Sequence, residues 1–240
     1  MKDIMGIEIE NMSAASAVRR IMGLLAREPL SVCTVLRADM LLLAEKDEEY
    51  REYLSQTALR IVGDAAILKA MGEERKDRLE ELENHSFQTQ LLKELSENGR
   101  PVAVLTETEA EKEKTVENLK RNYPSLSLAG AFSMETSDDM DDAVNHINGL
   151  DAELVIAKLP PPEQEAFIFS NKGRLNIRLW LGLGQASVAG HVTNVDAVHD
   201  VVEHIYQLGR HRGDRQLEQE PPYRLRTEQC LVLLHKSPSD

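Results

Sequence analysis

The arrangement of apolar segments constrains the fold of this 240-residue chain more than any other feature. Short runs of apolar and β-branched residues alternate with longer stretches in which apolar residues recur at helical spacing. Six runs are predicted to be strands: Val32 to Leu36, Leu59 to Val62, Val102 to Leu105, Leu126 to Ala131, Glu153 to Ala157 and Ile177 to Leu181. Strands that alternate with helices are typical of βαβ units. We therefore expect an α/β protein with a Rossmann-like, largely parallel sheet and flanking helices.

Capping residues mark where the intervening helices begin and end. Ser13 is expected to cap a helix whose apolar stripe includes Val18, Ile21, Met22 and Leu25. Asp39 is expected to cap a second helix that runs to about Leu54. The further predicted helices are 73–98 with a candidate break near Asn84, 109–122, and one that begins at Asp138 or Asp139 and ends at Gly149. Gly99 and Pro101 end the charged helix before the next strand.

The C-terminal part of the chain differs from the rest in its pattern. Residues 195–208 predict an amphipathic helix, and residues 209–222 predict a polar linker that contains Pro221 and Pro222. Residues 230–235 form one more apolar run, a candidate edge strand. We therefore divide the chain into an α/β domain, residues 1–208, and a C-terminal tail, residues 209–240.

Composition and charge exclude several classes of protein. The formal net charge of −13 disfavours nucleic acid as a partner, because the chain repels a phosphate backbone. No apolar run approaches 20 residues, and the acidic N-terminus is unlike a secretory signal, so we expect a cytoplasmic protein. The two cysteines, Cys33 and Cys230, form no C-x-x-C pair and predict neither a disulfide framework nor a zinc site. No metal and no cofactor are expected.

Ligands of open parallel sheets bind outside the carboxyl ends of the strands. In this chain those ends carry Arg37, Gly63 and Asp64, Thr106 and Glu107, residues 158–164, and residues 182–185. A carboxylate at the position of Asp64 could act as a general base, and it could equally cap a helix that begins at Ala65. For Lys158 the alternatives are a cation that binds phosphate and a solvated lysine at a strand end. For Gly182 and Gly184 they are a ligand-binding loop and a plain turn.

Several segments, in order, resemble the WecG/TagA/CpsF family of bacterial glycosyltransferases. Met5 to Ser13 is similar to the family's opening phrase, L-G-[IV]-x-[IV]-D-N-[LM]-[ST]. Ile61 to Asp64 matches the strand that ends in L-P-D-G, and Pro162 to Glu165 resembles the P-K-Q-E box. The other similar segments are Ala38 to Asp47, Asn98 to Val102, Leu119 to Pro124, Val188 to Gly190 and Glu203 to Leu208. The resemblance covers roughly Ile4 to Leu208.

The resemblance implies a reaction and assigns residues to it. Members of the family transfer an N-acetylhexosamine-type sugar from a UDP donor to a polyprenyl-diphosphate-linked acceptor at the inner face of the membrane. By position, Asp64 corresponds to the family's proposed general base. The substrate-binding residues implied for this chain are Arg37, Thr106, Lys158, Gln164, Glu165, Gly182, Gly184 and Gln185. The resemblance also implies a homo-oligomer and allows peripheral contact with the membrane.

Several positions depart from the family pattern and keep a second hypothesis open. Val35 and Arg37 stand where the family has threonine and asparagine, and Thr106 and Glu107 replace a pair of glycines. Glycines allow backbone amides to approach a phosphate, whereas a glutamate repels a diphosphate. Residues 160–162 are three prolines and lack N–H donors. The chain is therefore either an active, divergent transferase or a catalytically silent homologue that serves as a binding or regulatory partner.

Overall fold

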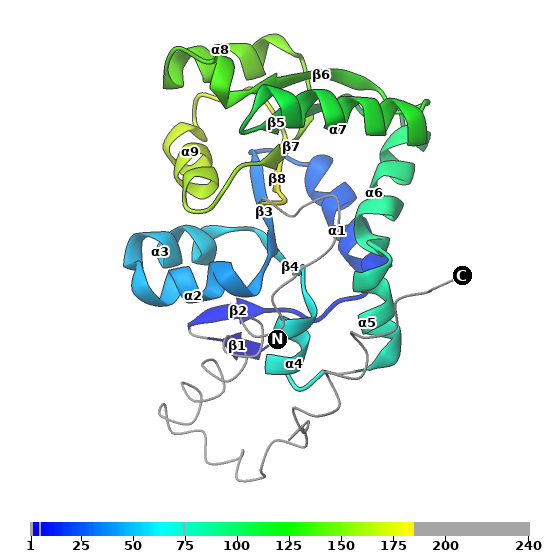
Figure 1. Ribbon diagram of the computed structural model, residues 1–240, viewed down its shortest axis with the longest axis vertical. Coiled ribbons are helices and arrows are strands. Elements are labelled where there is room, and N and C mark those ends of the chain that lie inside the picture. The colour runs from blue at the N-terminus through cyan, green and yellow to red at the C-terminus, as the bar shows by residue number, and fades with distance from the viewer. Residues whose placement is uncertain (1, 5, 74, 185–240) are drawn as a thin grey trace, which may run out of the picture.

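The computed structural model of the chain describes residues 2–4, 6–73 and 75–184. At its centre lies a six-stranded sheet in the order β4-β3-β8-β7-β5-β6, and every neighbouring pair is parallel (Figure 1). The strands are β3 (Ser31–Leu36), β4 (Leu59–Val62), β5 (Val102–Thr106), β6 (Leu128–Ser133), β7 (Leu154–Lys158) and β8 (Leu179–Gly182). The predicted α/β class with a largely parallel sheet is confirmed.

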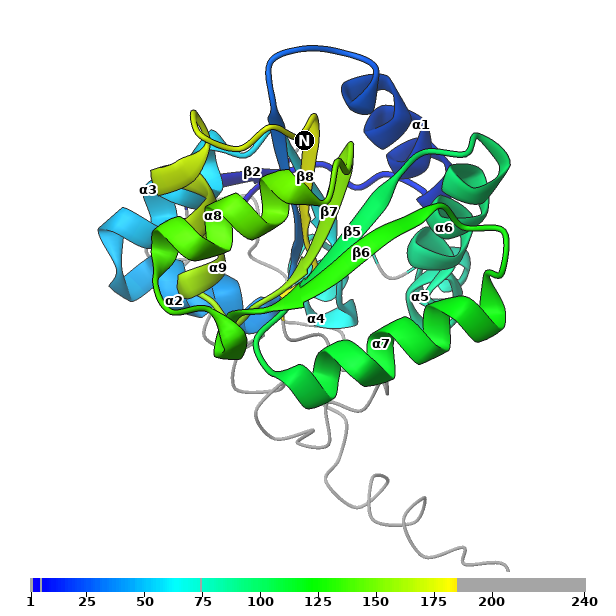
Figure 2. The same ribbon diagram turned by 90° about the horizontal axis from the view of Figure 1, so that it is seen from above.

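Helices cover both faces of the sheet, so the described part of the chain has three layers (Figure 2). One face packs against α1 (Ala14–Leu25), α6 (Ser86–Glu97) and α7 (Glu109–Asn122) through an apolar cluster that includes Ile21, Leu95 and Leu119. The other face packs against α2 (Ala38–Lys46), α3 (Glu48–Gln56), α4 (Ala65–Ala70), α8 (Met140–Gly149) and α9 (Glu163–Asn171). Alternate residues of each buried strand serve the two faces: Cys33 and Val35 belong to the first cluster, Val32 and Leu36 to the others.

Four further elements complete the described fold. A short antiparallel pair, β1 (Lys2–Ile4) and β2 (Ile7–Ile9), precedes the first helix and buries Ile4, Ile7 and Ile9 against α2, α3 and α4. Helix α5 (Lys76–Glu83) leads into α6, and the 3-10 helix η1 (Met134–Thr136) follows β6. The pair of strands was not predicted from the sequence, because each strand is only three residues long.

Most predicted boundaries agree with the structure to within two residues. Ser13 caps α1, its hydroxyl accepting the N–H of Ser16, and the charged helix breaks near Asn84 into α5 and α6. The chain then turns at Gly99, whose φ is +60°. Strand β6 begins two residues later than predicted, because the N–H of Leu126 bonds to the carbonyl of Tyr123 in a turn.

The prediction of one helix capped by Asp39 and running to about Leu54 is wrong. Helix α2 begins at Ala38, so Asp39 lies in its first turn, where the carboxylate pairs with Arg37 instead of capping. Asp47 adopts an extended conformation that ends α2, and its side chain accepts the N–H of Tyr50 at 3.0 Å to cap α3. Two helices with separate caps therefore replace the single predicted one.

Several predictions fall outside the described residues. These are the helix over 195–208, the tail over 209–240 with its candidate edge strand, and the substrate-binding role of Gln185. They stay predictions, as does the division of the chain at residue 208.

Candidate functional site

The carboxyl ends of the parallel strands form one edge of the sheet, and the predicted site residues divide into two groups along it. Arg37, Asp64, Gln164, Glu165, Gly182 and Gly184 lie around the ends of β4, β3 and β8, which we call the Asp64 half. Thr106 and Lys158 end the neighbouring strands β5 and β7 and are partners in their register. We call the ends of β7, β5 and β6 the Lys158 half.

Asp64 connects the first turns of two helices. One oxygen of its carboxylate accepts the N–H of Ala38 at 2.7 Å, and the other accepts the N–H of Ile67 at 3.1 Å. Asp64 is therefore the N-cap of α4, as one of the two alternatives predicted, and it also bonds to the start of α2. Gly63, just before it, has no room for a side chain, because a Cβ atom would lie 2.6 Å from the carbonyl oxygen of Leu36.

The pKa of Asp64 lies above its ordinary value. Burial is the main cause, since it disfavours the charged form, and the nearby charge of Asp39 adds to it. The backbone N–H groups of Ala38, Ile67 and Ala66 act in the opposite direction and lower this pKa. Each carboxylate oxygen accepts one of the two hydrogen bonds and retains a second lone pair, so the group can still accept a proton.

Arg37 lies next to Asp64 in the turn between β3 and α2. Its guanidinium group donates from two nitrogens to the carboxylate of Asp39, at 3.0 and 2.6 Å, and its side chain is 28% exposed. This is the fork geometry that arginine uses with carboxylates and phosphates. The pairing leaves a partly exposed cation at the Asp64 half, beside the N-terminus of α2.

Gln164 joins α9 to the end of β8. Its side-chain carbonyl accepts the N–H of Gly184 at 3.1 Å, while its NH₂ group donates to Oε1 of Glu165 at 2.8 Å. A Cβ atom on Gly182 would lie 2.3 Å from the nitrogen of this amide, so only glycine fits beneath it. Gly184 has a φ of +62°, the left-handed region that favours glycine. The predicted residues Gln164, Glu165, Gly182 and Gly184 thus form one packed unit.

Glu165 is surrounded by two hydroxyl groups that the sequence analysis did not identify. Thr34 of β3, Tyr50 of α3 and Glu165 are each 1% exposed. Within the described residues, the buried atoms Thr34 Oγ1, Tyr50 Oη and Glu165 Oε2 have no partner in hydrogen-bond geometry. Burial raises the pKa of Glu165 to about 7, opposed by Gln164 and by the two hydroxyls, which lie close enough to lower it. The one available signal was Thr34, a polar residue inside an apolar strand.

The Lys158 half is closed by ion pairs and hydrogen bonds. Lys158 is only 4% exposed, and its ammonium group donates to Glu111 at 2.5 Å and to Thr115 at 3.3 Å, both on α7. The interpretation of Lys158 as a solvated lysine is therefore wrong, and its binding of phosphate stays a prediction. The hydroxyl of Thr106 donates to the carbonyl of Thr108 at 2.9 Å.

Glu109 extends this network toward β6. Its carboxylate accepts the hydroxyl of Ser133 at 2.8 Å and forms an ion pair with Lys112. These contacts place acidic side chains where the resemblance implies a phosphate-binding loop.

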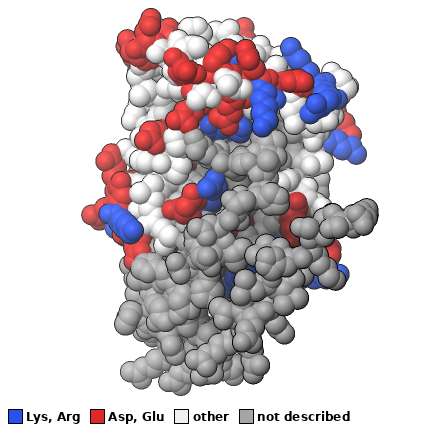
Figure 3. Space-filling model, viewed as in Figure 1, with Lys and Arg blue, Asp and Glu red and all other residues white. Residues whose placement is uncertain are grey.

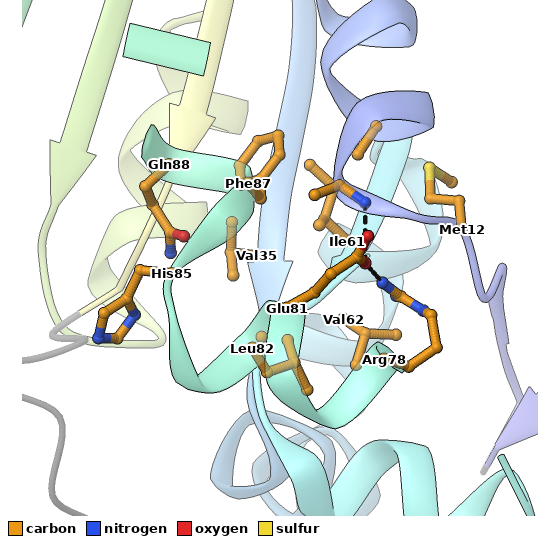
Figure 4. A pocket seen from close by; sticks show the side chains of 13 residues that line it. Met12, Val35, Ile61, Val62, Arg78, Glu81, Leu82, His85, Phe87 and Gln88 are labelled. Carbon is orange, nitrogen blue, oxygen red and sulfur yellow. Dashed lines mark hydrogen bonds and ion pairs between the residues drawn. The ribbon is translucent and has the colours of Figure 1, made fainter. Parts of the chain in front are cut away.

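A small cavity of about 30 Å³ lies on the other side of Gly63, between β3, β4, α1 and the α5–α6 junction (Figure 4). Figure 4 shows the carboxylate of Glu81 directed toward the guanidinium of Arg78, whose N–H it accepts. The same carboxylate accepts the N–H of Ala14 at 3.1 Å. Arg78 is 5% exposed and also donates to Asn11 at 3.0 Å. A cavity of this size holds about one water molecule. No pattern in the sequence predicted this cluster.

Two further properties bear on the class of site. Within the part of the chain that the structure describes, no group of three or more His, Cys, Asp or Glu side chains is placed to hold a metal ion. None of the helices between residues 2 and 184, with the undescribed positions set aside, has the length and apolar character needed to span a bilayer.

In open parallel α/β sheets ligands bind outside the carboxyl ends of the strands, and in this chain that edge carries polar side chains and a glycine turn. A family model described as "Glycosyl transferase WecG/TagA/CpsF family" matches residues 2–196. The chain therefore belongs to the WecG/TagA/CpsF glycosyltransferase family. No curated protein matches the sequence significantly.

Proposed function

We propose that this protein transfers an N-acetylhexosamine-type sugar from a UDP donor to a polyprenyl-diphosphate-linked acceptor, in the synthesis of a cell-surface polysaccharide or teichoic acid. The reaction would take place in the cytoplasm at the inner face of the membrane. The observation that carries the proposal is the Asp64 half of the site. There, in a member of this family, a carboxyl group of raised pKa lies at the same sheet edge as a glycine turn fixed by buried polar side chains.

Asp64 is proposed as the general base. The acceptor hydroxyl would bond to the anomeric carbon of the sugar while the bond from that carbon to the β-phosphate oxygen breaks and UDP leaves. The hydroxyl proton would pass to Asp64. A raised pKa makes a carboxylate a better proton acceptor near neutral pH, and a base of this kind contributes roughly 10²–10⁴ to the rate.

The remaining residues of the Asp64 half would bind the donor. Arg37 would meet the diphosphate with its partly exposed guanidinium, and the turn at Gly182 and Gly184, packed on Gln164, would lie beside the same phosphates. Gln164 and Glu165 would hold that turn, and Gln185 follows it in the sequence. Thr106 and Lys158 are assigned a weaker part in binding, because both are buried as well as bonded to other groups.

Charge and family also suggest the partners. On the face seen in Figure 3, acidic side chains gather over α8 and α7, in keeping with the net charge of −13, which supports the expectation that nucleic acid is not a partner. The family resemblance supports a homo-oligomer with peripheral contact to the membrane.

A second candidate function is a catalytically silent homologue that binds a true transferase or another ligand. The observation in its favour is the Lys158 half, where Glu111 neutralises the lysine and Glu109 lies at the strand ends. Such an arrangement disfavours a diphosphate in that half, because like charges repel at close range.

Thermal unfolding in the presence of UDP, UDP-N-acetylglucosamine and UDP-N-acetylmannosamine separates the two functions. A ligand at 100 times its dissociation constant stabilises the folded state by roughly 2.7 kcal/mol, which raises the melting temperature measurably. The transferase proposal predicts such a rise for UDP and for at least one UDP-sugar. An unchanged melting temperature at millimolar nucleotide would remove it and favour the silent homologue.

A further inference from the structure

The orientation of one buried amide group controls how the turn after β8 is held. The amide of Gln164 is 1% exposed and lies between two groups of opposite hydrogen-bonding character. The N–H of Gly184 can only donate, and a carboxylate of Glu165 can only accept. The amide therefore has one orientation that satisfies both neighbours, with its oxygen toward Gly184 at 3.1 Å and its nitrogen toward Glu165 at 2.8 Å.

The surroundings leave this amide little freedom to move elsewhere. It packs directly on Gly182, where even a methyl group would meet its nitrogen at 2.3 Å. Gly182 is the register partner of Thr34 in β3 and of Ala157 in β7, so the strand beneath is fixed from both sides. The amide can consequently rotate in place, but it cannot leave without opening the α9–β8 contact.

Glu165 and the Gly184 N–H together set which way the amide faces, and the second oxygen of Glu165 lies in a polar environment that is not saturated. Oε2 of Glu165 and the hydroxyls of Tyr50 and Thr34 are buried without partners in hydrogen-bond geometry, although the hydroxyls lie beside the carboxyl group. Buried polar groups are normally bonded, because an unmade bond costs about 1–3 kcal/mol. The ionised Oε2 can accept the hydroxyl protons of both Tyr50 and Thr34, which is why these neighbours lower the pKa that burial raises.

We infer that Glu165 is a positioning residue: through the amide of Gln164 it fixes the left-handed turn at Gly184, and it does so according to its own protonation state. The ionised carboxylate requires the NH₂ group of Gln164 and so directs the amide oxygen to Gly184. The neutral carboxyl group accepts the NH₂ group more weakly, because that hydrogen bond loses its charge assistance, so Glu165 then contributes less to holding the amide oxygen toward Gly184. This inference rests on the proposed function, because the turn is the part of the site assigned to the donor diphosphate.

The charge state of Glu165 is set within its own cluster. The pKa of Glu165, raised to about 7 by burial, places the change inside the neutral range. The titratable group that faces it from α3 is Tyr50, whose own pKa is raised by burial and by Glu165, so its hydroxyl stays protonated. Asp39 and Arg37 act on Tyr50 from the β3–α2 turn, and their opposite charges oppose one another. Thr34 and Gly182, from β3 and β8, do not titrate.

The test uses ¹⁵N-glycine labelling of the full chain, which has only 13 glycines, with Gly184 assigned from the spectrum of Gly184→Ala. Between about pH 5.5 and about pH 8.5 the amide resonance of Gly184 should move downfield with a midpoint near the Glu165 pKa of about 7, as its hydrogen bond strengthens. In Glu165→Gln the resonance should not titrate. Glu163→Gln removes an exposed charge from the same helix turn and should leave the titration as in the wild type.

The outcomes separate this inference from the proposed function, since the first measurement contains no nucleotide. A Gly184 resonance that does not titrate in the wild type overturns the inference, even if Glu165→Gln fails to fold. A titration that persists in Glu165→Gln overturns it as well. UDP is then added to the wild type: a titrating Gly184 together with UDP binding supports both proposals. A titrating Gly184 without UDP binding supports the positioning role and removes the transferase.

Discussion

The two halves of the carboxyl edge have the same backbone architecture but opposite chemistry. In the Asp64 half, helix starts, a glycine turn and buried polar atoms without partners surround the ends of β4, β3 and β8. In the Lys158 half, the polar groups that end β7, β5 and β6 are bonded to α7 and to its N-cap. Lys158 bonds to Glu111, Ser133 to Glu109, and Thr106 to the backbone carbonyl of Thr108. The Asp64 half contains polar atoms without hydrogen-bond partners, whereas the polar groups of the Lys158 half are bonded within the protein.

This difference determines where a ligand can gain free energy by binding. A diphosphate at the Lys158 half would have to displace a buried ion pair, and a buried lysine without its carboxylate is strongly destabilising. At the Asp64 half, a ligand would meet a partly exposed arginine, whose pair with the exposed Asp39 costs less to separate than a buried one. The family's substrate is therefore expected to be held mainly by β3, β4 and β8 in this chain.

The largest expected effect comes from Asp64→Asn. If the Asp64 half is the reaction centre, loss of the base should lower the transfer rate roughly 10²–10⁴-fold, measured as UDP release from a UDP-sugar in the presence of acceptor. Nucleotide binding should change little. Asp139→Asn is a matched control, because Asp139 also caps a helix by accepting the N–H of Asp142 at 2.9 Å. It lies at the start of α8 and not in the Asp64 half. Transfer that continues in Asp64→Asn would refute the assigned role.

The next largest effect is on stability, in the Lys158 half. Glu111→Ala leaves Lys158 buried without its partner, and since Glu111 is 28% exposed we expect a loss of roughly 2–3 kcal/mol in the free energy of unfolding. Urea unfolding measures it. Glu113→Ala, on the exposed side of the same helix, should change stability by less than about 0.5 kcal/mol. Equal losses in the two variants would mean that the Lys158 half is not closed by this pair.

The sequence was sufficient for the strands of the sheet and for the residues that follow their carboxyl ends. Apolar runs bounded by Gly, Pro and capping residues locate β3, β4, β5, β7 and β8 closely, since strand and helix periods are local properties. Asp64 could be identified as a cap and as a candidate base from its place after an apolar strand. These features depend on residues that are near one another in the chain.

The contacts that distinguish the two halves could not be predicted. Lys158 meets Glu111, 47 residues away, because β7 lies beside β5 and helix α7 follows β5. Tyr50 lies beside Glu165 only because α3 packs on α9. Such pairs follow from the order of strands in the sheet, and periodicity in the sequence does not contain that order. A charged residue at a strand end therefore has no defined partner until the topology is known.

A smaller effect is expected from Gly182→Ala, which tests the packing of the Asp64 half. The new methyl group would lie 2.3 Å from the amide nitrogen of Gln164, and this buried amide has no room to withdraw. We expect a loss of roughly 1–2 kcal/mol in the free energy of unfolding, as is usual for overpacking. Gly173→Ala is the matched control, since its added methyl group meets nothing within 4 Å. A Gly182→Ala protein as stable as Gly173→Ala would mean that the Gln164 amide is not held as described.

Counted per pH unit, the smallest effect is the pH dependence of stability that arises from Glu165 in the Asp64 half. Its pKa rises from an ordinary value of 4.5 to about 7 on folding, so between these values the folded state binds more protons than the unfolded state. Stability from this group is consequently greatest at low pH and falls as the pH rises through that window, by roughly 1 kcal/mol per pH unit. Urea unfolding at several pH values should show this fall in the wild type, and the fall should be absent in Glu165→Gln. Subtracting one profile from the other removes the contribution of all other titratable groups. If the two proteins have parallel profiles, folding does not raise the pKa of Glu165, and its carboxyl group is ionised at neutral pH in the folded state as well as in the unfolded state. The buried polar atoms around Glu165 would then have to be satisfied in a way that this structure does not describe.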